Sequence, residues 1–153
     1  MLVAALLHAA AAAGSAQANR PAGPDPCSLL TTDEVHRMAH ATVAFETESE
    51  GSSCNYSAGL TSVGLTLVTP AFFDRARTMA RNDRRYVYQA VSGVGQDAYL
   101  VYDTDPRAEM GAVYARVGAR AFQVSMDVPD RGQLPAVRAI LVDLAKAAAG
   151  RLR

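Results

Sequence analysis

The chain has 153 residues, of which 50% are hydrophobic, so it carries enough apolar material for one ordinary domain with a packed core. Lysine and arginine together number 15, as do aspartate and glutamate, and the formal net charge is therefore zero. A neutral chain has no general attraction to nucleic acid or to an anionic membrane, and we expect neither as a partner.

The N-terminal segment differs in composition from the rest of the chain. Residues 1–13 are almost wholly apolar and alanine-rich, and Ala16-Gln17-Ala18 has the small residues of a signal-peptidase cleavage site. No lysine or arginine precedes the apolar run, as one normally does in an export signal, and a buried alanine-rich helix is the alternative interpretation. We predict a signal peptide over 1–18, a flexible lead-in over 19–26 and a single domain over 27–153. The apolar run is short for a membrane-spanning helix, so we predict no transmembrane span in the mature chain.

The two cysteines, Cys27 and Cys54, both lie in the predicted mature part. An even number of cysteines in an exported chain indicates a disulfide, and two isolated cysteines do not complete a metal site. Pro24-Asp25-Pro26 precedes Cys27, where a lipoprotein signal would place an apolar residue and then small residues. We therefore expect a secreted or periplasmic protein with a disulfide bond and without a lipid anchor.

Two helices are predicted in the first half of the mature chain. Thr31-Thr32-Asp33-Glu34 has the form of a capping box and predicts a helix over 32–41. Thr69 and Pro70 begin the second helix with a cap residue and a proline at the first helical position. The apolar residues expected on its inner face are Phe72, Ala76 and Met79.

The remaining elements are strands and one further helix. Segments with β-prone or alternating residues predict strands at 42–45, 63–67, 86–88, 98–102, 110–117 and 120–128, and Gly51-Ser52-Ser53 predicts a turn before Cys54-Asn55-Tyr56. Gly118 and Ala119 join the last two strands in a hairpin. Apolar residues at three- and four-residue steps predict the last helix, namely Leu134, Val137, Leu141, Leu144 and Ala148. This order predicts an α+β domain, in which an antiparallel sheet has helices packed mainly on one face.

Three motifs of the mature chain resemble those of a group of small exported bacterial proteins, many of them actinobacterial lipoproteins, whose role is not established. They are Cys27-Ser28-Leu29-Leu30-Thr31 with Glu34-Val35, Gly51-x-x-Cys54-x-Tyr56, and the glycine-containing run Val91-Ser92-Gly93-Val94-Gly95-Gln96-Asp97-Ala98-Tyr99. The resemblance implies a Cys27–Cys54 bridge and an α+β sheet domain of the PsbP/Mog1 type. It implies no catalytic residue, and the chain departs from the group in lacking a lipobox.

A metal site is the first chemical candidate. His36 and His40 lie four positions apart on the predicted first helix, with Asp33 one turn earlier, and this spacing can hold a divalent cation. These residues lie away from the apolar stripe of the helix, and no glutamate occupies the general-base position of an H-E-x-x-H motif. We predict only adventitious binding there, and no metal.

The run Gly93-Val94-Gly95-Gln96-Asp97-Ala98 partly matches a dinucleotide-binding fingerprint. That chemistry needs the glycines to lead into a helix, whose N-terminus holds the pyrophosphate. A β-prone run follows instead, so we predict a turn between strands and expect no cofactor.

Arginines are concentrated in the second predicted helix and just after it. Arg81, Arg84 and Arg85 stand next to Tyr86, and arginine pairs well with the carboxylates or phosphates of a partner. The alternative is an exposed helix face whose charge is balanced by Asp74 and Asp83.

No serine elbow or free thiol indicates a nucleophile, and we predict that the chain is not an enzyme. We expect a binding or accessory module of the cell envelope, which recognises a ligand or partner protein outside the cytoplasm. The alternatives are an inhibitor of another protein, or a hydrolase that uses loop carboxylates, for which the candidates are Asp97, Asp103, Asp105 and Glu109. A converging pair of buried carboxylates would favour the hydrolase.

Overall fold

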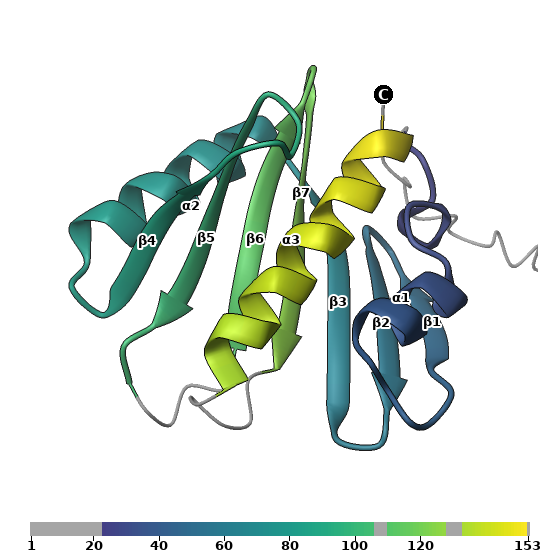
Figure 1. Cartoon of the computed structure of the whole chain (residues 1–153). Coiled ribbons are helices and arrows are strands. Elements are labelled where there is room, and N and C mark those ends of the chain that lie inside the picture. The colour runs from purple at the N-terminus through teal and green to yellow at the C-terminus, as the bar shows by residue number, and fades with distance from the viewer. Residues whose placement is uncertain (1–22, 106–109, 128–132, 153) are drawn as a thin grey trace, which may run out of the picture.

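A seven-stranded antiparallel sheet forms the frame of the domain (Figure 1). The computed structural model describes residues 23–105, 110–127 and 133–152, so the predicted signal peptide over 1–18 and residues 19–22 lie outside it, as does Glu109. In chain order the strands are β1 (Glu46–Glu50), β2 (Ser53–Ala58), β3 (Thr61–Val68), β4 (Tyr86–Val91), β5 (Asp97–Asp103), β6 (Met110–Val117) and β7 (Arg120–Asp127). Their order across the sheet is β1-β2-β3-β7-β6-β5-β4, which makes β1 and β4 the two edges.

Helices cover the sheet unequally on its two faces. The 3₁₀-helix η1 (Pro26–Ser28), α1 (Thr32–Met38) and α3 (Leu134–Arg151) lie on one face, and α2 (Pro70–Asn82) lies on the other, behind β4 to β6 in Figure 1. The side chains of β5 show this division, because Leu100 belongs to the large core under α3 whereas its neighbour Tyr99 packs with Phe73 of α2. The predicted α+β fold, with helices mainly on one face, is confirmed.

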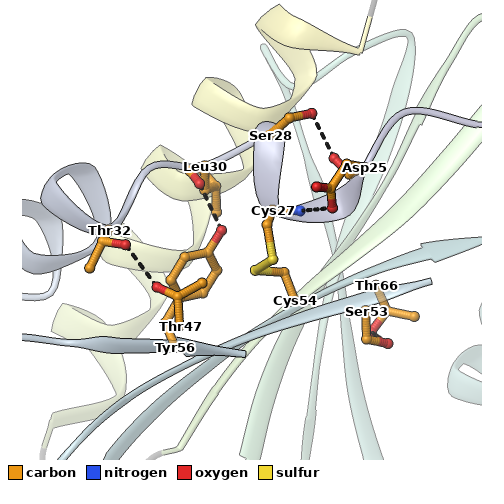
Figure 2. Close-up of a disulfide and its surroundings, with 10 residues drawn as sticks. All are labelled: Asp25, Cys27, Ser28, Leu30, Thr32, Thr47, Ser53, Cys54, Tyr56 and Thr66. Carbon is orange, nitrogen blue, oxygen red and sulfur yellow. Dashed lines mark hydrogen bonds between the residues drawn. A yellow bond between two sulfur atoms is a disulfide. The ribbon is translucent and has the colours of Figure 1, made fainter. Parts of the chain in front are cut away.

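A disulfide between Cys27 and Cys54 fastens the start of the domain to β2, as predicted (Figure 2). Cys54 is fully buried, and the Asp25 carboxylate accepts a hydrogen bond from the Cys27 N–H at 3.0 Å. Beside the bridge, the buried Tyr56 hydroxyl donates to the Leu30 carbonyl at 2.7 Å. The Asp25 carboxylate caps η1, and the disulfide and the Tyr56 hydrogen bond hold η1 and the residues that follow it against the sheet.

Two predicted helix boundaries need correction, although the capping box at Thr31 and Glu34 is confirmed. The first helix ends at Met38 instead of residue 41, because the backbone turns to a positive φ of 51° at His40. Residues 42–45 form no strand, and the first strand begins at Glu46. Since β1 is exposed along its whole length, it has no alternation of apolar and polar residues by which to recognise it.

The second helix begins at Pro70 with Thr69 as its cap, as predicted, but its inner face is rotated by about one residue from the expected one. Its buried residues are Phe73, Ala76 and Ala80. Phe72 and Met79 are 38% and 52% exposed, so the prediction was wrong for two of the three residues expected on the inner face. The last helix and the β6–β7 hairpin agree with the sequence prediction.

None of the helices in the described ranges is long and apolar enough to cross a membrane.

Candidate functional site

A small aromatic core fixes α2 on its face of the sheet. The Thr69 hydroxyl accepts a hydrogen bond from the Phe72 N–H at 3.1 Å and so caps the start of the helix. The next residue, Phe73, is fully buried against the sheet. Tyr99 contacts Phe73 with ring centroids 5.1 Å apart and donates its hydroxyl to the Phe73 carbonyl at 2.8 Å. Because burial raises the pKa of Tyr99, the hydroxyl stays neutral and keeps donating.

Two arginines complete this core from the side. The guanidinium carbons of Arg77 and Arg116 lie 4.8 and 4.7 Å from the centroid of the Phe73 ring. Arg77 pairs with Asp97, and Arg116 pairs with Asp74 at 2.8 Å. Both arginines are therefore engaged within the domain, and they do not offer charge to a partner.

The sequence-predicted candidates Arg81, Arg84, Arg85 and Tyr86 come together where α2 ends and β4 begins. Arg85 lies 5.4 Å from the Tyr86 ring centroid and pairs with Asp83 at 2.8 Å, and its hydrogen bonds lower the pKa of the Asp83 carboxyl. Each of the three arginines is exposed. We call these four residues, together with Tyr88, the arginine–tyrosine surface.

Part of the positive charge on this surface is uncompensated. Arg81 lies 5.3 Å from the Tyr88 ring centroid. Within the part of the chain that the structure describes, neither Arg81 nor Arg84 pairs with a carboxylate. A guanidinium group that rests on an aromatic ring keeps its N–H donors available, so the surface can bind carboxylates.

The other end of the sheet carries the opposite charge. On β1, Glu46, Glu48 and Glu50 alternate with Thr47 and Ser49, and the whole strand is exposed. Over the described ranges these glutamates form no ion pair. Charge is therefore unevenly distributed along the sheet, with three glutamates on the β1 edge and the unpaired Arg81 and Arg84 beside the β4 edge.

The loop carboxylates proposed for a hydrolase do not converge in the described structure. Asp97 is paired with Arg77, and Asp103 accepts a hydrogen bond from the Asp105 N–H at 2.8 Å. No charged side chain among the described residues is buried. Two open pockets of about 600 and 650 Å³ flank the β6–β7 turn, but the only charged residues that line them are Asp25 and Arg120. Neither pocket presents a pair of carboxylates.

The two histidines predicted as metal candidates do not share one face of a helix. His40 follows the end of α1, so the one-turn spacing from His36 is not that of a helix, and the His36 ring contacts Phe45 instead. Over the described residues, no group of three or more histidine, cysteine or acidic side chains can hold a metal ion.

The glycine run that partly matches a dinucleotide-binding fingerprint forms a turn. Gly93 and Gly95 have positive φ angles of 79° and 58° and lead into β5, which confirms the predicted turn.

Comparisons of the chain with protein-family models, curated proteins and solved structures give no match. The resemblance to exported bacterial lipoproteins and the PsbP/Mog1-type fold therefore remain predictions from the motifs.

Proposed function

We propose that the chain is a non-enzymatic binding module of the cell envelope, which recognises an acidic partner protein through the arginine–tyrosine surface. The observation that carries this proposal is the pair of exposed arginines, Arg81 and Arg84, that have no carboxylate partner among the described residues. The Cys27–Cys54 disulfide supports a site of action outside the cytoplasm, because such bonds persist in oxidising compartments.

The charge distribution supports an acidic protein as the partner. Arginine forks match the geometry of carboxylates, and the tyrosine rings beneath Arg81 and Arg85 limit how far these side chains must be ordered on binding. The acidic strand β1 at the far edge repels the same partner, so the field of the domain directs an acidic surface toward β4. Such steering is reduced by salt.

Site-specific cross-linking in the native cells tests the proposal. A photoreactive amino acid is placed at Arg84 or, as a matched control, at Arg138, which is exposed on α3 on the opposite face. We expect a covalent adduct between the exported chain and an acidic protein from position 84 only, and its loss when Arg81→Glu is added. Equal adducts from both positions, or none from either, would overturn the proposed function.

A further inference from the structure

The two edges of the sheet differ in how they are protected against pairing. Strand β1 carries three glutamates in five residues, and charged side chains on an edge discourage the addition of another strand. Strand β4, Tyr-Val-Tyr-Gln-Ala-Val, carries no charged side chain and no proline. Its register with β5 runs without a bulge from Tyr86↔Asp103 to Val91↔Ala98. The β4 edge therefore lacks the usual features that prevent pairing.

The backbone of β4 leaves donors and acceptors directed away from the sheet. The Arg85 carbonyl accepts a hydrogen bond from the Thr104 N–H at 2.6 Å, so Arg85 faces β5. Backbone groups alternate along an antiparallel strand, and Tyr86, Tyr88 and Ala90 therefore face outward. The Tyr86 N–H donates a hydrogen bond to the Asp83 carbonyl at 3.0 Å. Among the described residues, the N–H and carbonyl groups of Tyr88 and Ala90 have no hydrogen-bond partner.

The side chains of β4 define what an added strand would carry. Tyr86 and Tyr88 lie on the α2 face, beside the guanidinium groups of Arg85 and Arg81. Val87 and Gln89 lie on the opposite face and are half-buried. Residues of a neighbouring strand that lie opposite the tyrosines share their face, so acidic side chains there meet the arginines, and the intervening residues meet Val87 and Gln89.

We infer that the partner contributes an extended segment of alternating acidic and apolar residues, which adds antiparallel to β4 as an eighth strand; this inference rests on the proposed function. Main-chain hydrogen bonds to Tyr88 and Ala90 supply affinity, and the arginines select the acidic residues. A second copy of the chain fits this edge less well. Pairing of β4 with a second β4 places against the tyrosines a strand that carries no acidic side chain, so it offers the arginines no carboxylate.

A pair of methylated peptides tests the inference with a matched control. The probe is the fluorescein-labelled peptide Glu-Val-Glu-Val-Glu-Val, titrated with the oxidised mature chain and followed by fluorescence anisotropy. In an antiparallel pair, a residue opposite Tyr88 directs its N–H toward β4, so the glutamate N–H groups point inward and the valine N–H groups point to water. We expect N-methylation of the glutamates to weaken binding about tenfold or more, and N-methylation of the valines to change it by less than about threefold. Equal affinities of the two methylated peptides, or the reverse order, would overturn the inference.

A change in the protein tests the same edge from the other side. Because the Ala90 N–H points outward, Ala90→Pro removes a docking donor and leaves the β4–β5 ladder intact. We expect weaker peptide binding at an unchanged melting temperature. A concentration-dependent dimer in sedimentation that Ala90→Pro abolishes would identify a second copy as the occupant, and would overturn the inference of a foreign segment.

The outcomes separate this inference from the proposed function. The double variant Arg81→Glu with Arg84→Glu is compared with Arg37→Glu with Arg138→Glu, which reverses two exposed arginines elsewhere. If only the first double variant loses binding and the two methylated peptides bind alike, the result supports an acidic partner but contradicts strand addition. If the unmethylated acidic peptide binds no better than a peptide with lysine in place of each glutamate, both the proposed function and the strand-addition inference are contradicted.

Discussion

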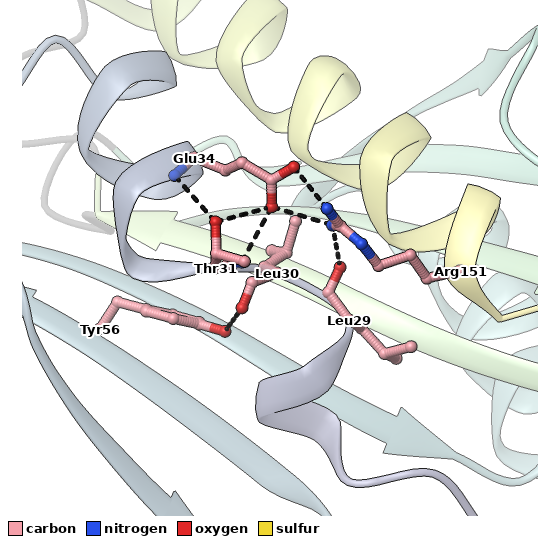
Figure 3. A network of polar contacts seen from close by, with 6 residues as sticks. All are labelled: Leu29, Leu30, Thr31, Glu34, Tyr56 and Arg151. Carbon is pink, nitrogen blue, oxygen red and sulfur yellow. Dashed lines mark hydrogen bonds and ion pairs between the residues drawn. The ribbon is translucent and has the colours of Figure 1, made fainter.

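Arg151, in the last turn of α3, donates hydrogen bonds to both carboxylate oxygens of Glu34, in the first turn of α1, at 2.9 and 2.6 Å (Figure 3). The same guanidinium group donates to the Leu29 carbonyl at 2.9 Å. Glu34 also accepts from the Thr31 N–H at 2.9 Å, which completes the capping box. One carboxylate therefore joins the two ends of the domain and begins its first helix.

This contact makes the stability of the fold depend on acid pH. The hydrogen bond from Arg151 holds the pKa of Glu34 at about 2, against a usual 4.5. A carboxyl whose pKa is lowered by folding contributes stability above its unfolded pKa and loses it as the pH falls through the folded value. We expect the unfolding free energy, measured in urea from about pH 5 to about pH 2, to fall more steeply for the wild type than for Glu34→Gln. Glu48→Gln, in an unpaired exposed glutamate, should follow the wild type, and parallel curves for all three proteins would contradict the prediction.

The disulfide should contribute a measurable share of the stability. Its sequence separation is 27 residues, and closing a loop of that size stabilises by about 3–4 kcal/mol in the chain-entropy model. We expect Cys27→Ser combined with Cys54→Ala to lower the unfolding free energy by that order in non-reducing buffer. Alanine replaces the fully buried Cys54 because serine would add the cost of burying a hydroxyl. An unchanged melting temperature would show that the bond does not form.

Two buried tyrosine hydroxyls make equivalent hydrogen bonds on opposite faces of the sheet. Tyr56 donates to the Leu30 carbonyl and Tyr99 to the Phe73 carbonyl. We expect Tyr56→Phe and Tyr99→Phe each to cost about 1–2 kcal/mol, because each leaves a carbonyl without its donor. Tyr102→Phe is the control, since the half-buried Tyr102 hydroxyl has no hydrogen-bond partner in the described part of the chain. Equal losses in chemical denaturation for all three variants would contradict the prediction, because the two hydrogen bonds would then contribute nothing beyond the removal of a hydroxyl.

Export is tested by the mass of the protein that reaches the outside of the cell. We expect a mature chain that begins at Asn19, with a mass lower by two hydrogens than the reduced chain. An intact Met1 with free thiols would contradict both cleavage and the oxidised state. The measurement uses the natural N-terminal segment, so it does not depend on the binding proposal.

The sequence predicts the frame of this domain well wherever a signal is local. The capping box at Thr31, the Thr69-Pro70 helix start and the hairpin at Gly118 depend on a few adjacent residues, and each is confirmed. Strand β1 was missed because both of its faces are exposed, which leaves no apolar alternation to detect. A hydrophobic pattern reports burial, so it cannot reveal an element that buries nothing.

The candidate surface was predicted in part. Arg81, Arg84, Arg85 and Tyr86 are close together in the chain, and their grouping needed no knowledge of the fold. The ion pair between Arg77 and Asp97 could not be predicted, because it depends on how α2 packs relative to β5, which the sequence does not show. The outward direction of β4 depends on its place at the edge of the sheet, and that place is set by strand order, a non-local property.

Adjacent phenylalanines on α2 separate the predicted from the observed inner face. Phe73 is fully buried against Tyr99, whereas Phe72 is 38% exposed over Tyr114. We expect Phe73→Ala to cost about 3–5 kcal/mol, because it opens a cavity in the small core. Phe72→Ala removes a half-exposed contact and should cost less than about 1.5 kcal/mol. The same substitution at neighbouring positions controls for helix propensity, so the difference in unfolding free energy measures burial alone. If Phe72→Ala were the more damaging, α2 would lie on the sheet with the face that its sequence pattern suggests, and the arginines that extend from it would be differently placed.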